Sequence, residues 1–580
     1  MLIVSRVVFQ SKSTVKNDPL PMTTRTRTDV LLIGGFCAFL FFYGLSQFGL
    51  IGADEPRYAQ VAREMLERHD WITPVLNGRP WLEKPPLYYW QAMLAYSLFG
   101  VTDWAARIPS AVDAALMVVT VYLFFRRFRQ SLEVDAALIT ASCAGVIGFA
   151  RAASMDMALA AVFTMGMLAW WAWRESGSRG YLALFYVAMA LGMLAKGPVA
   201  PLLAGAVIVG YAATAREFRL IPRTLWLPGI LLFAAISLPW YFAVQMHNPE
   251  FFRVFILEHN LARFSSDLYH HREPFWYYIR VTALALIPWT VFVFAALIQT
   301  VRVWWLERRS AAVPESDLEF QFRVFACCWL VVPVVFFSIS RSKLPGYILL
   351  AIPAGALLLA DYLRHQLKEE SAEPISKWLV ILHALLAAAT FVPALLIAHL
   401  LVDHRLPGGK PLFLALAAAF ALAAGIALTL VSKLGLRMLR FVTLVPVILS
   451  VGAVLKFGST DLDRTLSARP LFTEISSMET HRLALAVFRV SRELEYGLTF
   501  YRNQPAMRYE LGQIPTEEHL VVAPENWQPE VTREVAQKGA RRVSFLGHYA
   551  PQHVDYFWVS AAGGHGTLVL SPRKRLATAD

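Results

Sequence analysis

Two charged groups near the start of the chain combine residue types that bind phosphate and orient reacting groups. Asp54, Glu55 and Arg57 stand close together, and Glu83 and Lys84 follow in the same polar segment. A carboxylate acts as a general base or positions a nucleophile, whereas arginine and lysine beside the N–H groups of a helix start bind phosphate. We therefore predict that Asp54, with Glu55 beside it, supplies the catalytic carboxylate and that Arg57 and Lys84 hold a phosphate.

Two short helices are expected to position these charges. Residues 54–66 carry apolar side chains at the spacing of an amphipathic helix, and Pro56 suits its first turn. A second helix is expected from Pro85 to about residue 100, after a tight turn at Asn77 and Gly78. Both charged groups then lie at helix N-termini. The alternative role of Asp54 is a simple N-cap of the first helix.

The composition of the whole chain is that of a polytopic membrane protein. Its 580 residues are 57% hydrophobic and only 17% charged, which argues against a disordered chain and against an ordinary soluble enzyme. Thirteen apolar runs of spanning or near-spanning length lie near residues 30–49, 105–125, 136–150, 155–173, 181–195, 198–214, 225–244, 277–300, 324–340, 345–362, 378–400, 411–432 and 441–457. Two of them, 136–150 and 181–195, are shorter than the roughly 20 residues that a bilayer needs and suit tilted or re-entrant segments.

Positive charge divides unevenly between the short loops. Alternate loops, with the N-terminal segment, hold 23 lysines and arginines, whereas the opposite short loops hold 6. Because basic loops stay in the cytoplasm, the N-terminus is predicted inside and, after thirteen spans, the C-terminus outside. The net charge of +12 therefore reflects topology, and no nucleic-acid partner is expected.

Three parts of the chain follow from this pattern. A cytoplasmic segment at 1–29 precedes a transmembrane domain at 30–457, which has long outside loops at 50–104 and 245–276, and a polar tail occupies 458–580. The tail contains β-like runs at 519–524, 541–549, 556–561 and 567–572 and a helical run at 529–540. The predicted fold class is mainly α, a polytopic transmembrane helical protein with a small C-terminal extracytoplasmic α/β domain.

Several short motifs add a family resemblance to this interpretation. They are Asp-Glu-Pro-Arg-Tyr-Ala at 54–59, Glu-Lys-Pro-Pro-Leu-Tyr-Tyr-Trp at 83–90, Ser-Met-Asp-Met at 154–157, Leu-Ala-Lys-Gly-Pro at 194–198, Arg263-Phe264, His271 before Pro-Phe-Trp-Tyr-Tyr at 274–278, and Ser-Lys-Leu-Pro-Gly-Tyr at 342–347. Together they resemble the bacterial branch of the GT-C membrane glycosyltransferases. That branch is related to the protein O-mannosyltransferases and includes the aminoarabinose transferase that modifies lipid A.

The resemblance implies the reaction and its partners. It implies an inner-membrane enzyme of about thirteen spans that moves a sugar from a polyprenyl (undecaprenyl) phosphate donor to a periplasmic acceptor, with 4-amino-4-deoxy-L-arabinose and lipid A as the leading pair. A lipid-linked donor needs no nucleotide and no required cofactor. This sequence departs from the aminoarabinose enzyme at Pro56 and at residues 86–88. A relative that transfers another sugar, mannosyl-type, to a protein, lipid or glycan is therefore the alternative.

Further site residues come from the outside loops. Lys196, Arg341 and Lys343 run against the charge bias and, with Arg263, are predicted to bind the donor phosphate, their alternative being contact with anionic lipid headgroups. Residues predicted to contact sugar or acceptor are Tyr58, Tyr88, Asp156 and Tyr347. For Asp156 the alternative is an N-cap, and for the tyrosines an interfacial aromatic belt.

A metal site and two other function classes complete the alternatives. Glu83 and His271 are chemically suitable ligands for a divalent metal ion, although no ligand spacing supports the pair. A lipid or sugar transporter is a weaker alternative, because transporters place ionisable groups near the bilayer midplane and often show repeated halves. A structural or sensor protein would leave the first-loop charges unexplained.

Overall fold

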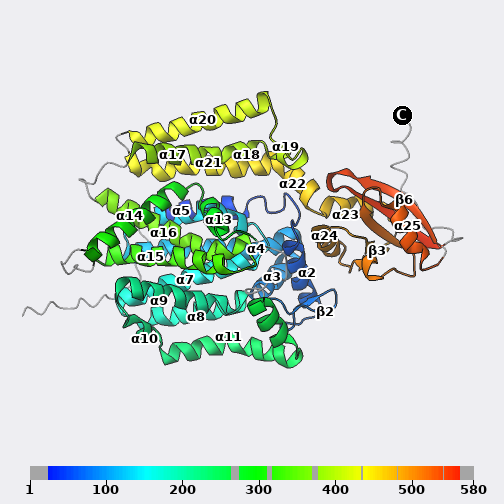
Figure 1. The fold of residues 1–580 in the computed structure, drawn as a ribbon, viewed down its shortest axis with the longest axis horizontal. Helices are drawn as coiled ribbons and strands as arrows, with labels where there is room; N and C mark the ends of the chain where they lie inside the picture. The colour runs from blue at the N-terminus through cyan, green and yellow to red at the C-terminus, as the bar shows by residue number, and fades with distance from the viewer. Residues whose placement is uncertain are drawn as a thin grey trace, which may run out of the picture.

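The helices form a long bundle, and a small sheet domain lies beyond one of its ends (Figure 1). The computed structural model describes residues 24–262, 273–309, 317–368, 376–432, 435–479, 481–539 and 541–561. Helices α2 (Asp54–Glu67) and α3 (Leu87–Phe99) lie between the bundle and the sheet domain. The predicted fold class, a multi-pass helical membrane protein with a small C-terminal sheet region, is confirmed.

Within these described ranges, nine helices are long and apolar enough to cross a membrane, and a tenth span results if one bent pair is counted. The nine are α4 (Asp103–Phe128), α7 (Met155–Ser176), α11 (Leu227–His247), α14 (Thr290–Arg309), α15 (Leu318–Ile339), η3 with α16 (Pro345–Ala351, Ile352–Lys368), α17 with α18 (Lys377–Ala389, Phe391–Leu395), α20 (Lys410–Val431), and α21 with η5 and α22 (Leu439–Ala453, Val454–Gly458, Ser459–Leu466). The count of thirteen spans stays a prediction.

The remaining helical segments are shorter, bent or less apolar. The bent pair is α5 (Glu133–Ser142) and α6 (Ala144–Ala150), which meet at 66°. It covers the apolar run at 136–150, one of the two that are shorter than a bilayer needs. The others are α1 (Thr24–Cys37), η1 (Ala38–Phe42), α8 (Arg179–Lys196), α9 (Val199–Ala215), α10 (Leu220–Thr224), η2 (Arg253–Ala262), α13 (Tyr277–Ala285), α19 (Ile397–Val402) and η4 (Gly435–Met438).

Burial separates central helices from helices at the rim of the bundle. The spanning windows of α7 and of η3 with α16 are 83% and 94% buried, so these segments form the centre. The windows of α11, α14 and α20 are only 22%, 28% and 28% buried. Because these rim helices are nevertheless strongly apolar, their outer faces are suited to contact lipid rather than water.

Residues 50–104, the segment predicted as the first outside loop, fold as their sequence pattern indicates. Helix α2 begins at Asp54 and α3 is followed by Gly100, while the strands β1 (Val75–Leu76) and β2 (Arg79–Pro80) pair antiparallel around the predicted tight turn. Glu64 fixes that turn, because its carboxylate accepts hydrogen bonds from Asn77 N at 2.8 Å and Gly78 N at 3.0 Å. The buried face of α2 therefore holds both the hairpin and α3 in place.

The C-terminal domain is a five-stranded mixed sheet in the order β4-β3-β5-β7-β6. Its elements are α23 (Arg469–Ser476), β3 (Ala484–Val487), α24 (Arg492–Arg502), β4 (Met507–Arg508), η6 (Tyr509–Leu511), β5 (His519–Pro524), α25 (Gln528–Ala536), β6 (Arg541–Tyr549), η7 (Ala550–Gln552) and β7 (Val554–Ala561). Strands β4, β3 and β5 are parallel, and β7 pairs antiparallel with β5 and β6. The strand expected at 567–572 lies outside the described residues.

This domain docks on α2 and on the start of α4. Arg63 of α2 donates to Phe500 O at 2.8 Å, and Arg469 forms ion pairs with Asp103 and Asp463, each at 2.8 Å. The ring of Phe500 also belongs to the apolar cluster beneath α2 and α3. Shared apolar burial and partly buried ion pairs together hold the two parts in one arrangement.

A buried ion pair fixes α2 to the membrane domain. The guanidinium of Arg107 on α4 is fully buried and donates to the Glu55 carboxylate at 2.7 and 3.2 Å. Glu55 also accepts hydrogen bonds from Ile51 N and Ala153 N, each at 2.8 Å. With both carboxylate oxygens bonded, the charge is compensated where water is excluded.

Replacing Arg107 by alanine should destabilise the protein strongly, because Glu55 would stay buried without its cation; the expected cost is about 3–5 kcal/mol. The midpoint of thermal unfolding of the purified protein in detergent measures this loss. The control is Arg253→Ala, which breaks the exposed pair with Glu250 and should cost at most about 1 kcal/mol. Equal shifts for the two variants would show that the buried pair is not the anchor.

Candidate functional site

A cavity of about 740 Å³ lies where α2, the segment before α3, the membrane helices and the C-terminal domain meet. It collects nine of the residues that the sequence singles out, namely Asp54, Glu55, Arg57, Tyr58, Glu83, Lys84, Asp156, Lys196 and Tyr347. These come from the first outside loop, from the start of α7, from the end of α8 and from η3. Segments almost 300 residues apart in the sequence thus bring charged side chains together in one cavity at one end of the bundle, among apolar residues such as Phe149, Met155 and Leu344.

Asp54 is exposed at the start of α2, whereas Arg57 is mostly buried beside it. Ala53 is the N-cap of this helix and no side chain caps it, so Asp54 is not an N-cap. Its carboxylate, 57% exposed, instead forms an ion pair with Arg57 one turn later. The N-cap alternative is therefore wrong, and the carboxylate remains open to the cavity.

Aromatic rings surround the guanidinium of Arg57. Its central carbon lies 5.2 Å from the ring centroid of Tyr58, 5.1 Å from that of Trp81 and 5.6 Å from that of Tyr496. Burial alone lowers the pKa of Arg57, but Tyr58, Asp54 and Glu83 raise it above its ordinary value. This cage holds a permanent cation with a planar set of donors, which suits a bidentate contact with phosphate.

Tyr58, which lines the cavity beside Arg57, carries a neutral hydroxyl that is able to donate a hydrogen bond. Burial raises the pKa of its hydroxyl far above the ordinary value, and the charge of Asp54 raises it further. The hydroxyl therefore stays protonated at any physiological pH. It is able to donate a hydrogen bond to an oxygen in the cavity but not to act as a base.

A second carboxylate and cation pair stands on the opposite wall. Asp156 in the first turn of α7 forms an ion pair with Lys196 in the last turn of α8. The N-cap of α7 is Ser154, whose hydroxyl accepts from Asp156 N at 3.1 Å, so Asp156 is not the cap. Lys196 Nζ also lies 4.7 Å from the ring centroid of Tyr347. The pair is held rigidly and only partly exposed.

The contacts of Glu55 do not support a catalytic role. Although it borders the cavity, its carboxylate is 7% exposed and is bonded to Arg107 and to two backbone amides. A carboxylate whose oxygens are all engaged in a buried network lacks a free lone pair for a substrate proton. Its position is that of an anchor beside Asp54.

Three other predicted residues, Tyr88, Arg341 and Lys343, do not line this cavity. Tyr88 is fully buried and donates to Ala106 O at 2.9 Å. Lys343 is 7% exposed and its Nζ donates to Ser340 O at 2.5 Å. The neighbouring Arg341 is exposed and is not among the residues that line the cavity. Arg263 lies outside the described residues. No phosphate contact in the cavity is therefore supported for Arg341 or Lys343.

The metal prediction stays a prediction. Glu83 lines the cavity, whereas His271 lies outside the described residues. In the part of the chain that is described, no three histidine, cysteine, aspartate or glutamate side chains come together as a metal site. No step of the chemistry below is assigned to a metal ion.

The C-terminal domain adds residues that sequence reasoning missed. Arg492, Glu493 and Tyr496 of α24 and Arg508 of β4 line the same cavity. Arg508 donates to Glu495 at 2.7 Å, and burial raises the pKa of that carboxyl. Their sequence carries no distinctive motif, and only docking of the domain on α2 adds two more arginines to the cavity that Arg57 and Lys84 line.

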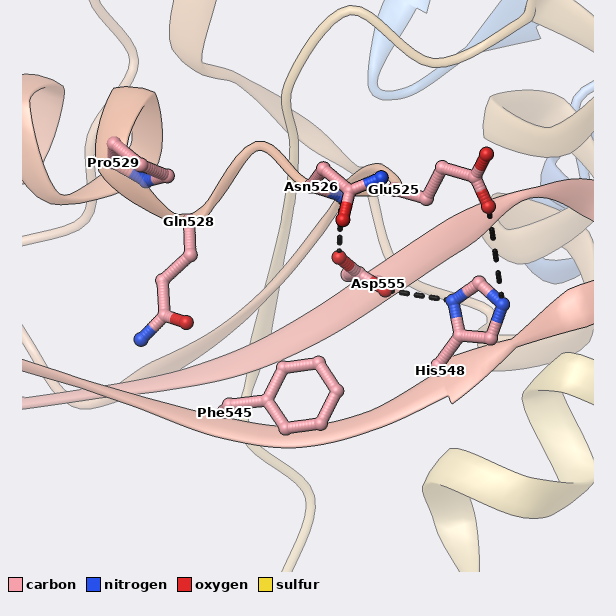
Figure 2. Close-up of a pocket in the computed structure, with 7 residues that line it drawn as sticks. All are labelled: Glu525, Asn526, Gln528, Pro529, Phe545, His548 and Asp555. Carbon is pink, nitrogen blue, oxygen red and sulfur yellow. Dashed lines mark hydrogen bonds and ion pairs between the residues drawn. The ribbon is translucent and has the colours of Figure 1, made fainter.

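A second polar hollow, of about 620 Å³, lies on the C-terminal domain alone (Figure 2). There His548 Nδ1 lies 2.8 Å from Asp555 and its Nε2 lies 3.9 Å from Glu525, and Asn526 N donates to Asp555 at 2.8 Å. These bonds join β6, β7 and the loop after β5, with Phe545 exposed beside them. The cluster ties the edge of the sheet together and is separate from the cavity at α2.

Comparison with known proteins first defines the class. A family model described as dolichyl-phosphate-mannose-protein mannosyltransferase matches residues 83–242. The fold is similar to the crystal structure of ArnT from Cupriavidus metallidurans bound to undecaprenyl phosphate, with a TM-score of 0.70 and 24% identity, covering 91% of this chain and 97% of that one. The architecture is that of the GT-C membrane glycosyltransferases.

Sequence relatives then define the family. An undecaprenyl phosphate-alpha-4-amino-4-deoxy-L-arabinose arabinosyl transferase of Aeromonas hydrophila is 30% identical over 448 residues, 74% of this chain and 78% of the relative. A Pseudomonas aeruginosa protein of the same name is 34% identical over 359 residues, and the match spans 60% of this chain and 61% of that relative's length. The chain belongs to this family of arabinosyl transferases.

Gly346 is required by the close approach of η3 to α7. A Cβ at this position would lie 2.7 Å from Asp156 Cγ, so Gly346→Ala should displace the Asp156 and Lys196 pair and destabilise the protein by about 1–3 kcal/mol. Thermal unfolding measures the effect. Gly148→Ala on α6 is the matched control, because nothing lies within 4 Å of its Cβ and no loss is expected. An unchanged midpoint for Gly346→Ala would contradict the tight packing of this wall.

Proposed function

We propose that the protein transfers 4-amino-4-deoxy-L-arabinose from undecaprenyl phosphate to a phosphate of lipid A at the periplasmic face of the inner membrane. The observation that carries this proposal is the cavity at the membrane end of α2, where Arg57, Lys84 and Lys196 lie with Asp54 and Asp156. Membership in the arabinosyl transferase family supports the donor. The similar fold that binds undecaprenyl phosphate is consistent with it.

The topology belongs to the same proposal. The charge bias of the loops supports a cytoplasmic segment at residues 1–29 and a periplasmic domain at 458–580. The cavity then opens at the outer leaflet, where the polyprenyl tail stays in lipid and the sugar phosphate reaches the polar hollow. This arrangement allows a lipid-linked donor and a lipid acceptor to meet without either leaving the membrane.

The reaction displaces the donor phosphate from the anomeric carbon. An oxygen of the acceptor forms a bond to that carbon while the bond from the carbon to the phosphate oxygen of the donor breaks, and the electron pair leaves with undecaprenyl phosphate. Negative charge therefore grows on the leaving phosphate. Arg57 and Lys84 are proposed to stabilise it, and the caged guanidinium of Arg57 is already oriented before substrate arrives.

Asp54 is proposed to orient the acceptor. A lipid A phosphate is already ionised and nucleophilic, so it needs positioning more than deprotonation, although Asp54 is able to serve as a base for a hydroxyl acceptor. Tyr58, Tyr347 and Asp156 line the space between the two walls and are proposed to contact the sugar. Arg492 and Arg508, on the domain side, are proposed to bind the acceptor phosphate.

Mannosyl-type transfer to a protein is the second candidate. The observation that favours it is the match of residues 83–242 to the dolichyl-phosphate-mannose-protein mannosyltransferase model. A single assay separates the two. Purified protein in lipid is supplied with undecaprenyl phosphate carrying aminoarabinose or mannose, and with lipid A or a periplasmic protein extract, and the products are identified by mass. Transfer only of mannose to protein would replace the first proposal.

Asp54→Asn keeps the size of the side chain and removes its charge, and we expect turnover of aminoarabinose transfer to fall by about 100-fold or more while the protein still folds. Turnover is measured with purified variant in lipid, together with its unfolding midpoint. Asp403→Asn, which changes an exposed carboxylate that pairs with His399, is the control and should retain full activity. If Asp54→Asn kept near-normal turnover, Asp54 would have no role in the reaction beyond its ion pair with Arg57.

Lys84→Ala and Arg492→Ala should separate the two substrates. Lys84→Ala is expected to raise the KM for the donor about 10- to 100-fold, because a charge-assisted hydrogen bond contributes about 1.5–3 kcal/mol. Arg492→Ala should raise the KM for lipid A by a similar factor. Each variant should leave the KM for the other substrate nearly unchanged. The same KM effect on both substrates in both variants would contradict separate donor and acceptor sides.

A further inference from the structure

A lipid-facing groove lies at the rim of the bundle, at the membrane end opposite the C-terminal domain. Helix α8 packs against both α9 and α11, and the groove of about 270 Å³ runs between α9 and α11 with α8 as its floor. Figure 1 shows these helices together at one edge of the bundle, with α10 at the end far from the sheet domain. Its lining is almost wholly apolar and includes Phe185, Met189, Ile208, Val209, Ile230 and Phe233.

The packing keeps this groove open and gives it a closed end. The ring of Tyr186 crosses α11 at Gly229, where an added Cβ would lie 2.2 Å from the ring, and its hydroxyl donates to Thr224 O at 2.7 Å. Thr224 in turn accepts from the buried indole of Trp170 at 3.0 Å. At the other side, nothing lies within 4 Å of a Cβ built on Gly205, so this glycine leaves space in the groove.

Basic side chains gather at the closed end. Arg219 and Arg223 belong to the α10 turn that carries Thr224, and Arg179 begins α8 with its guanidinium 6.0 Å from the ring centroid of Trp226. All three are exposed, and within the described ranges none is ion-paired with a carboxylate. By contrast, Arg174 close by is buried against Glu217 at 2.6 Å. Three cations with no carboxylate partner among the described residues thus lie on the segments at the α10 end of an apolar groove, next to its lining residues Ile221, Thr224 and Leu225.

We propose that this groove binds one acyl chain of an anionic phospholipid from the leaflet opposite the cavity, with the headgroup phosphate held by Arg179, Arg219 and Arg223. An apolar chain suits the lining, and the charge at the closed end is complementary to a headgroup with net negative charge. A zwitterionic headgroup carries its own cation and gains less from three arginines. The site is independent of the proposed sugar transfer, since it lies at the other membrane face.

The bound lipid would join α10 and α11 to α8. Helix α11 is only 22% buried over its spanning window, and it packs on the bundle through α8. A ligand that binds the folded but not the unfolded protein raises its stability, and the gain grows with the ratio of ligand concentration to Kd. Anionic phospholipid should therefore raise the unfolding midpoint of this protein more than a zwitterionic lipid with the same chains.

The test measures retained lipid on the purified full-length protein by native mass spectrometry, after addition of phosphatidylglycerol or phosphatidylcholine with identical chains. Phosphatidylglycerol should stay bound to wild type, and its affinity should fall about tenfold or more in Arg219→Gln/Arg223→Gln. Gly205→Leu fills the groove without changing charge and should also lose the lipid. The control, Arg127→Gln/Arg302→Gln, removes two exposed charges at the same membrane face and should retain it.

Any of three results would overturn the proposal. Equal loss of phosphatidylglycerol from the control and from Arg219→Gln/Arg223→Gln would mean general attraction to a basic face. Equal retention of phosphatidylcholine and phosphatidylglycerol by wild type would mean that the groove holds bulk lipid. Arg179→Gln alone, which leaves α10 intact, gives a second measure if the double variant unfolds, and unchanged affinity in that variant would also contradict the site.

Discussion

The buried ion pair of Glu55 and Arg107 is the interaction on which the rest of the site depends. Arg107 donates not only to Glu55 but also to Leu45 O, Phe48 O and Gly49 O at 2.7–2.9 Å, while Glu55 accepts from Ala153 N. The end of the first apolar run, the surface helix α2, the start of α4 and the loop before α7 therefore meet at one pair of charges. In a low dielectric such a network persists only if every polar group is satisfied, and here it fixes the floor of the cavity.

The docked domain is the second constraint, because a membrane bundle alone would leave this floor open to water. Tyr501 accepts from Leu50 N at 2.8 Å, and Gly49 leaves no room for a side chain between Ser467 and Tyr501. Tyr496, from the same helix as Tyr501, completes the aromatic cage of Arg57. Arg57, the cation on α2, is thus held by both the membrane bundle and the C-terminal domain, and the cavity lies where these two parts meet.

Local patterns sufficed for the fold and for part of the site. Strands β5 and β6, α2 and the hairpin follow from turn residues and periodicity, which act within a few residues. Neighbouring positions in the sequence were a poorer guide to function. Asp54 and Glu55 are adjacent, but successive residues of a helix point about 100° apart, so Asp54 faces the cavity and Glu55 faces the core. Arg492 and Tyr496 reach the site only through docking of segments more than 400 residues apart, which no local pattern encodes.

The charge balance in the cavity implies different roles for the carboxylates of Asp54 and Asp156. The lining carries five basic and five acidic side chains, and both Arg57 and Lys196 are ion-paired with aspartates. A donor phosphate that enters this neutral cavity competes with those aspartates for the same cations. Asp54 is 57% exposed and is able to turn away, whereas Asp156 is 20% exposed and is tied to Ser154. Under the proposed function, donor binding therefore releases Asp54 rather than Asp156, and the released carboxylate is the one placed to orient an acceptor.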